Sequence, residues 1–200
     1  MTIDRLTLIL MLIFLSACFS PLKEIKDPDE PIKRESFLIL PPSGEGWRYI
    51  EQEQANGFIL TFSKPGLSPS HTVTGIVVEY QGNIDFSSPD YFLDYIREMK
   101  EGDINSWHYN IIRREWVLDD RFGEYSVHYH TVFEEQDIYS MKPKEFFLTK
   151  IYGYAIKHPY VKNLIIDILY TEHGKPAEVN PQFEQQALKF IEGLHLKKSK

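Results

Sequence analysis

The spacing of apolar and polar residues along the chain predicts several strands and two helices. Residues 71–80 form a long β-branched run (HTVTGIVVEY), which strands favour. Two shorter runs, at 47–52 and 58–64, are joined across Asn56-Gly57, a dipeptide that is typical of a tight hairpin turn. Apolar and β-branched residues predict further strands at 37–40, 107–117, 124–134, 146–156 and 164–170.

Two segments change to a helical period, and Ser88 and Asn180 precede them as expected capping residues. The apolar face of residues 89–101 consists of Phe92, Ile96 and Met99, with Leu93 beside them. The stripe of residues 181–193 consists of Phe183, Ala187, Leu188 and Ile191, and Leu194 extends it. Consecutive strands with short links form an antiparallel sheet that amphipathic helices must cover. We therefore predict an α+β fold with an antiparallel sheet of six to seven strands and two covering helices.

The N-terminal segment has the layout of a secretory signal peptide. A short charged start precedes an apolar run at 6–15, which spans about 15 Å as a helix and is too short to cross a bilayer. The stretch Leu15-Ser16-Ala17-Cys18 resembles the lipobox of bacterial lipoproteins. The resemblance implies that residues 1–17 are removed and that Cys18, the only cysteine, is acylated and holds the protein on a membrane.

The residues after the lipobox bear on location and domain organisation. In Gram-negative lipoproteins an aspartate after the cysteine favours the inner membrane, whereas this chain has Phe19. The resemblance therefore implies the outer membrane, with the domain facing the periplasm. Residues 18–35 hold charges of both signs and several prolines, which predicts an extended, flexible linker. Residues 36–200 are then expected to form a single domain.

Local sequence also resembles the PsbP-like group, which includes the extrinsic PsbP subunit of photosystem II and periplasmic lipoproteins of the DcrB group. The matching stretches are Phe37-Leu38-Ile39-Leu40-Pro41 followed by Gly46-Trp47, the run at 58–62, and the closing QFEQQALKFIEGLHL. This resemblance implies an α/β/α sandwich. It also implies a non-enzymatic role in binding or assembling a protein or envelope partner, because the group shares a scaffold and not an activity.

The net charge and the absence of two sequence motifs argue against nucleic-acid binding and against enzyme activity. The net charge of −7 makes nucleic acid an unexpected partner. The sequence has neither a phosphate-binding glycine loop nor a nucleophile elbow, so we predict no enzyme activity, no catalytic residue and no cofactor. A small-ligand or metal-binding module, and a hydrolase of envelope polymers, are the alternatives.

His128 and His130 have the spacing of metal ligands on a strand, because residues i and i+2 share a face. If the chain turns near Asp120 after Val117, His108 comes within diagonal reach and becomes a third candidate ligand. The opposite face of the same strand is apolar and consists of Tyr125, Val127, Tyr129 and Phe133. That pattern favours the interpretation that the histidines lie on a polar or helix-shielded surface and hold no metal.

Aromatic residues concentrate in the later strands. Phe146, Leu148, Tyr152 and Tyr154 share one strand face with Lys150, which predicts a half-exposed surface for a partner. The alternative is that these residues belong to the core and to cross-strand pairs.

Overall fold

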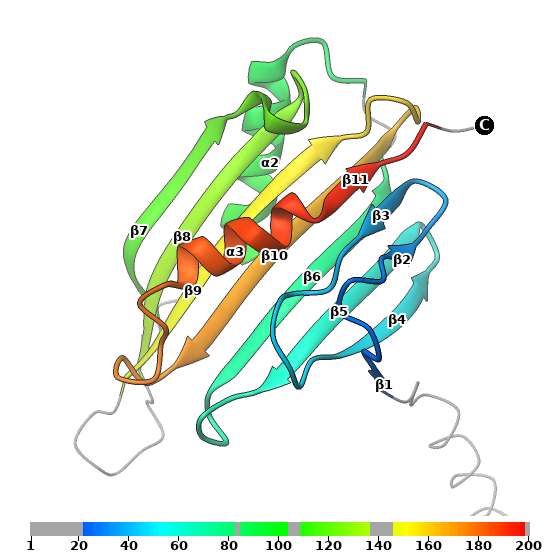
Figure 1. Ribbon diagram of the computed structural model, residues 1–200. Helices are drawn as coiled ribbons and strands as arrows, with labels where there is room; N and C mark the ends of the chain where they lie inside the picture. The colour runs from blue at the N-terminus through cyan, green and yellow to red at the C-terminus, as the bar shows by residue number, and fades with distance from the viewer. Residues whose placement is uncertain (1–21, 83–84, 104–108, 137–145, 199–200) are drawn as a thin grey trace, which may run out of the picture.

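The computed structural model describes residues 22–82, 85–103, 109–136 and 146–198. Within these ranges eight strands form one large antiparallel sheet, which Figure 1 shows face on. In chain order the strands are β1 (Lys23–Glu24), β4 (Arg48–Gln54), β5 (Gly57–Pro65), β6 (Thr72–Gln81), β7 (Tyr109–Leu118), β8 (Ser126–Gln136), β9 (Phe146–Lys157) and β10 (Leu164–Gly174). Their order across the sheet is β1-β4-β5-β6-β10-β9-β8-β7, so β1 and β7 are its edge strands.

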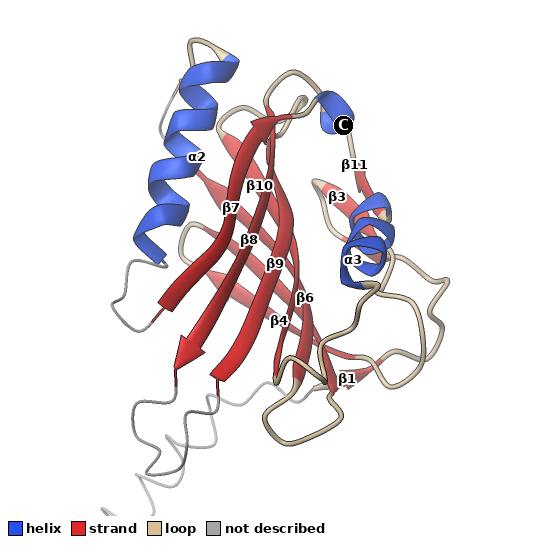
Figure 2. Ribbon diagram, turned by 90° about the vertical axis from the view of Figure 1, so that its left-hand side faces the viewer, coloured by secondary structure: helices blue, strands red, loops and turns tan. Residues whose placement is uncertain are grey.

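The two faces of the large sheet are covered differently (Figure 2). One face carries α2 (Pro89–Asp103), and the other carries α3 (Phe183–Glu192) together with a small sheet. The small sheet has the order β11-β3-β2 and consists of β2 (Ile32–Lys33), β3 (Phe37–Ile39) and β11 (Leu194–Leu196). None of the helices in the described ranges combines the length and the apolar character that crossing a bilayer requires.

Each face has its own core. The core beneath α3 includes Phe62, Ile168, Tyr170, Phe183 and Phe190. The core beneath α2 includes Phe92, Ile96, Val127, Tyr129 and Ile165. β10 contributes to both, and its sequence is accordingly a nearly continuous apolar run (LIIDILY). The predicted face of residues 89–101 is confirmed, and the Tyr91 N–H donates to Ser88 Oγ at 3.2 Å, as expected of a cap.

The predicted fold class is wrong in the size and covering of the sheet. We predicted six to seven strands in a PsbP-like α/β/α sandwich, whereas eight strands are present and a second sheet helps α3 to cover one face. The difference comes largely from residues 22–35, which were expected to belong to a flexible linker. β1 pairs with β4, β2 pairs with β3, and Ile25 and Ile32 pack against the core. Two-residue strands are too short to leave a periodic signal in the sequence.

Two local predictions are also corrected. The predicted hairpin joins β4 and β5, but Gln54 pairs with Gly57, so Ala55 and Asn56 form the turn. Gly57 is needed for close approach instead, because a Cβ there would collide with the carbonyl oxygen of Glu79 on β6. At the start of α3 the N-cap position is Gln182, whose side chain makes no capping bond, while Asn180 Oδ1 accepts from the Gln182 N–H at 2.8 Å.

Candidate functional site

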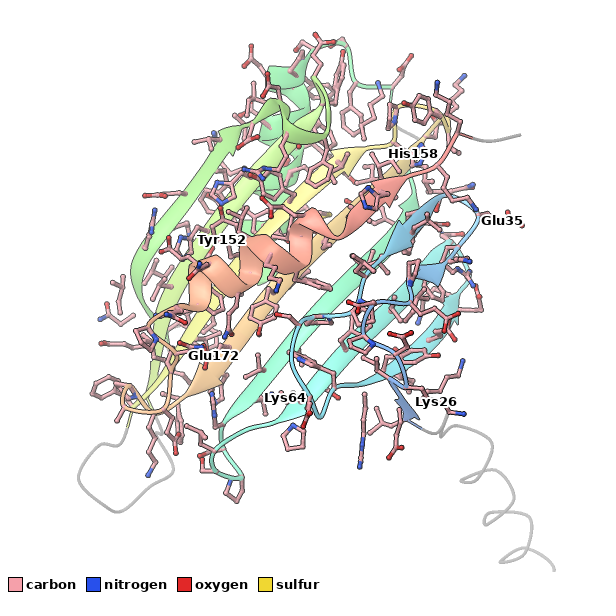
Figure 3. All side chains as sticks on the ribbon, viewed as in Figure 1. Lys26, Glu35, Lys64, Tyr152, His158 and Glu172 are labelled. Atoms are coloured by element: carbon pink, nitrogen blue, oxygen red, sulfur yellow. The ribbon has the colours of Figure 1, made fainter. Side chains whose placement is uncertain are left out.

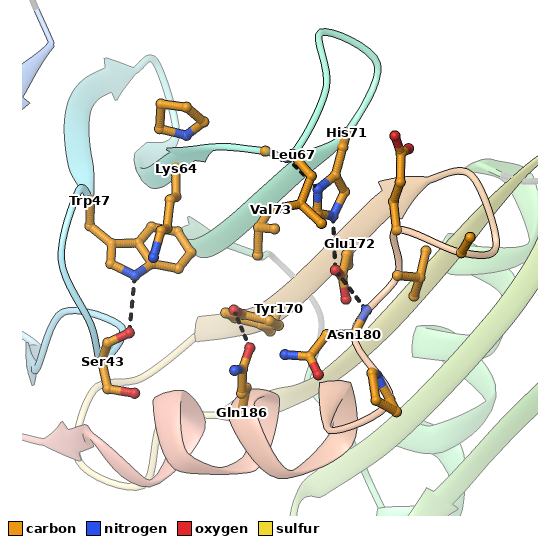
Figure 4. Close-up of a pocket in the computed structure, with 16 residues that line it drawn as sticks. Ser43, Trp47, Lys64, Leu67, His71, Val73, Tyr170, Glu172, Asn180 and Gln186 are labelled. Atoms are coloured by element: carbon orange, nitrogen blue, oxygen red, sulfur yellow. Dashed lines mark hydrogen bonds and ion pairs between the residues drawn. The ribbon is translucent and has the colours of Figure 1, made fainter.

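A pocket of about 480 Å³ opens between the large sheet and the loop that leads into α3 (Figure 4). Its volume lies in the range of small-molecule sites. The side chains that matter most for its chemistry are Trp47, Lys64, His71, Val73, Tyr170 and Glu172. The remaining wall comes from α3 and the preceding loop, which contribute Gln186 and Asn180.

Strand register explains why these side chains meet. Lys64 on β5 is directly opposite Val73 on β6, and Val73 is directly opposite Glu172 on β10. Residues that are directly opposite in an antiparallel sheet point to the same face, so the three form one row across three neighbouring strands. Lys64 and Glu172 lie toward the same end of the sheet, on the face that α3 crosses (Figure 3). The row therefore places a cation and a carboxylate on either side of a valine.

His71 and Glu172 form a buried pair at the pocket wall. Their exposed fractions are 6% and 2%. The Leu67 N–H donates to His71 Nδ1 at 2.8 Å, so Nδ1 carries no proton and the ring proton is on Nε2. That proton is donated to Glu172 Oε1 at 2.9 Å, and the Asn180 N–H donates to the same oxygen at 3.0 Å. Both ring nitrogens of His71 are thus engaged in holding Glu172 and the preceding loop.

Glu172 retains an unused acceptor. Both of its hydrogen bonds go to Oε1, and Oε2 has no hydrogen-bond partner in the part of the chain that the structure describes. Oε2 is not among the fully buried side-chain atoms that lack a partner, so it faces the pocket. A ligand that supplies a donor there replaces a water contact with a charge-assisted hydrogen bond. The pocket wall accordingly offers a fixed acceptor.

The other charged groups give the pocket two unlike ends. Lys64 makes no hydrogen bond or ion pair with any described residue, and its side chain is half-buried. Near Glu172, the Lys175 N–H donates to Glu178 at 2.9 Å and holds the pKa of Glu178 below its usual range. Glu178 therefore stays charged near neutral pH. The pocket is acidic at one end and basic at the other.

Two aromatic side chains, Trp47 and Tyr170, also line the pocket. The rings of Trp47 and Tyr170 are 6.1 Å apart, and both residues belong to the core beneath α3. Their polar atoms are bound to neighbours. Trp47 Nε1 donates to the Ser43 carbonyl at 3.2 Å, and the Tyr170 hydroxyl donates to Gln186 Oε1 at 3.3 Å. The surface that they present to a ligand is therefore largely apolar.

The histidines that the sequence singled out lie elsewhere, beneath α3. His130 is buried, and His128 is half-buried. The rings of His128 and Tyr152 are 4.5 Å apart, and His130 Nδ1 is 3.7 Å from a carboxylate oxygen of Glu184 on α3. The prediction of a helix-shielded surface is confirmed for His130. Within the described ranges, no group of three histidine, cysteine or acidic residues is placed to hold a metal ion.

The register assumed for His108 is wrong. Glu115 and not Asn110 lies opposite His130, because a short 3-10 helix, η1 (Asp120–Phe122), lies in the turn and moves its centre beyond Asp120. A bulge between Ile111 and Arg113 shifts the register again farther along β7. His108 itself lies outside the described residues. The predicted convergence of the three histidines consequently has no support from the strand register.

Burial lowers the pKa of both His128 and His130, and the nearby Arg113 guanidinium lowers them further. Both pKa values are then lower in the folded than in the unfolded chain, where a histidine titrates near 6.5. The contribution of the two neutral histidines to stability is therefore complete at a pH above their pKa in the unfolded chain. It is lost as the pH falls through their pKa in the folded protein.

We therefore expect the free energy of unfolding to fall on acidification below about pH 6.5. The double substitution His128→Phe and His130→Leu should flatten this dependence. Denaturant unfolding at a series of pH values measures it, with His195→Gln, on the short strand β11, as a matched control. An equal pH dependence in the double variant and the natural protein would show that other groups cause it.

The predicted partner surface is only partly exposed. Phe146 is 41% exposed and Leu148 and Tyr152 are half-buried, but Tyr154 is 1% exposed. The Tyr154 hydroxyl donates to Asp119 Oδ2 at 3.0 Å, and η1 covers its ring through Phe122. Tyr154 is thus a core residue. Partner binding at the Phe146 end of β9 remains a prediction, as does acylation of Cys18, which lies outside the described residues.

Sequence reasoning missed the pair His71 and Glu172, although one signal for it was present. Ile166, Ile168 and Tyr170 alternate along one face of β10, and Glu172 continues that apolar face with an acid. An acid on a core face needs a partner or a ligand. Its partner, His71, is far away in sequence and could not be named from the pattern.

Comparisons with known proteins add little to this picture. No family model matches the chain, and no curated protein matches it. Among solved structures, the chain is similar to LpqN, described as involved in cell envelope biogenesis of Mycobacterium tuberculosis. The identity is 12% and the TM-score 0.44, over 88% of this chain and 90% of that one.

Proposed function

We propose that this protein is a lipid-anchored protein of the cell envelope that binds a small molecule in the pocket beside Glu172, without catalysing a reaction. The observation that carries the proposal is the buried carboxylate of Glu172, which is held through one oxygen while no described residue donates to the other. A site with an immobile acceptor, an apolar wall and a volume of about 480 Å³ suits a ligand of modest size.

The location rests on the sequence. The lipobox-like Leu15-Ser16-Ala17-Cys18 supports acylation at Cys18, and Phe19 supports the outer membrane and a domain that faces the periplasm. In the full chain, Cys18→Ser should abolish incorporation of a labelled fatty acid and release the protein from the membrane fraction. Label that persists in Cys18→Ser would contradict the anchor.

The choice of binding over hydrolysis rests on His71. A general base needs a free nitrogen lone pair directed at a substrate or nucleophile. In His71, Nδ1 accepts from the Leu67 N–H and Nε2 donates to Glu172, so neither nitrogen is available. The pair is built to position a carboxylate rather than to move a proton.

The test is a ligand screen on the full-length Cys18→Ser protein, read from the ¹⁵N-indole resonance of Trp47. We expect compounds that shift this resonance to bind about tenfold more weakly to Glu172→Gln, whose amide oxygen can still accept from His71 and Asn180.

Glu184→Gln is the matched control, because Glu184 is an exposed acid of α3 outside the pocket. If every compound in a broad screen leaves the Trp47 resonance unchanged, the proposed function is wrong. The same conclusion follows if binding is insensitive to Glu172→Gln.

A further inference from the structure

The two ends of the pocket specify the kind of ligand. The Lys64 ammonium at one end and Glu172 Oε2 at the other pair with none of the residues that the structure describes. From these two groups we infer that the pocket binds a short peptide with a free N-terminus and a free C-terminus. This inference rests on the proposed function and names its ligand class. The peptide ammonium pairs with Glu172, and the peptide carboxylate pairs with Lys64.

The charges that line the pocket disfavour a ligand that carries charge of only one sign. A ligand with only negative charge would gain from Lys64 but would meet Glu172 and Glu178 at the other end. A ligand with only positive charge would gain from Glu172 and Glu178 but would leave Lys64 without a counter-charge. A ligand that carries both charges, one at each end, satisfies the whole pocket.

The row of Lys64, Val73 and Glu172 across the sheet indicates the length of the peptide. Lys64 and Glu172 flank Val73 on neighbouring strands, so their Cα atoms are two strand spacings apart, or about 10 Å. An extended chain covers at most about 3.5 Å per residue, so about three residues bridge this distance.

The residues in the middle of the pocket indicate which side chain is preferred at the central position of the peptide. Val73 lies between the two charges, and the rings of Trp47 and Tyr170 border the same space. Figure 4 shows Val73 and Tyr170 between Lys64 and Glu172, with the Trp47 indole beside Lys64. A central apolar residue in the peptide would be removed from water there, which favours binding.

A second lysine provides the comparison that a test needs. Lys150 on β9 is directly opposite Glu172, on the side away from Val73. Its ammonium lies 5.7 Å from the centre of the Phe183 ring, and the residue does not line the pocket. Lys150 and Lys64 therefore carry the same charge and lie in the same row of residues across the sheet, but only Lys64 lines the pocket.

The test uses the tripeptide Ala-Val-Ala with the full-length Cys18→Ser protein, measured by isothermal titration calorimetry near neutral pH. We expect N-acetylation and C-amidation of the tripeptide each to weaken binding about tenfold. Lys64→Gln should remove the effect of amidation and leave the effect of acetylation. Glu172→Gln should do the reverse, and Lys150→Gln should change neither.

Each outcome of this experiment either supports or overturns the inference that the pocket binds a peptide. Equal binding of free and blocked tripeptides would overturn the inference, as would an amidation effect that survives Lys64→Gln. If no tripeptide binds at millimolar concentration while another compound still shifts the Trp47 resonance, the pocket binds small molecules but not peptides. If nothing shifts that resonance, the proposed function falls as well. If Glu172→Gln does not fold, the blocked peptides and the Lys64→Gln variant still test whether the pocket binds a peptide.

Discussion

Replacing Phe190 by alanine should lower the free energy of unfolding by about 3–5 kcal/mol, the usual cost of removing a buried aromatic ring. Phe190 is buried on the inner face of α3. Its ring lies 5.7 Å from that of Phe62 on β5 and 6.0 Å from that of Tyr170 on β10. The ring joins the helix to two strands of the sheet, and its loss opens a cavity that neither element can close.

Phe190 also packs against a glycine of the sheet, Gly75, and this contact allows a second test. A Cβ at Gly75 would lie 2.9 Å from Phe190 Cζ and 3.2 Å from Pro42 Cγ. Gly75→Ala alone should therefore destabilise the protein through overpacking by about 1–3 kcal/mol. In the Phe190→Ala background the ring is gone, and the new methyl group fills part of the cavity.

The two substitutions should consequently couple. We expect the double variant to be more stable than the sum of the single effects predicts, by more than the roughly 0.5 kcal/mol that independent sites show. Denaturant unfolding measures all four proteins of the cycle. Gly82→Ala is the control, since a Cβ there would meet only Ile165 Cδ1, at 3.9 Å. Strict additivity with Gly75→Ala would show that α3 is not seated on the glycine as described.

The long elements of the fold were predictable because each carries its own periodic signal. Buried positions alternate along β5, and the buried residues of α2 recur at helical spacing. The failures have a different origin. β1 and β2 owe their existence to the neighbours with which they pair, and two residues carry no period of their own.

The pocket was not predictable because no single segment contains it. Its row depends on β6, which pairs with β5 on one side and with β10 on the other. The first pairing follows from chain order, but α2 and three strands separate β6 from β10. Without that pairing, Lys64 and Glu172 have no spatial relation. An acid on an apolar strand face was visible in the sequence, whereas its surroundings were not.

A second acid of β10 gives the other large expected effect, on the opposite face of the sheet. Asp167 is buried beneath α2, and its carboxylate accepts from Lys100 Nζ at 2.5 Å and from the Tyr129 hydroxyl at 2.5 Å. The Lys100 ammonium also lies 4.7 Å from the centre of the Tyr129 ring. Burial raises the pKa of the nearby Tyr80, and the charge of Asp167 raises it further. Lys100 thus fixes the second half of α2 to the centre of the sheet.

Lys100→Met should lower the free energy of unfolding by about 3–5 kcal/mol, because it keeps the apolar stem but leaves the Asp167 carboxylate buried without its ammonium partner. The double variant Lys100→Met/Asp167→Asn should recover much of that loss. The amide removes the unpaired charge, and its carbonyl oxygen can still accept from Tyr129.

Denaturant unfolding of the single and double variants provides the measurement, with Lys189→Met on the exposed side of α3 as the control for losing one positive charge. A double variant no more stable than Lys100→Met would mean that the cost lies in lost packing of the lysine stem. Recovery of stability in the double variant would show that the ion pair with Lys100 offsets the cost of burying the Asp167 charge. The two acids of β10 would then differ in a defined way. Asp167 has its cation supplied by α2, whereas Glu172 keeps one oxygen open to the pocket.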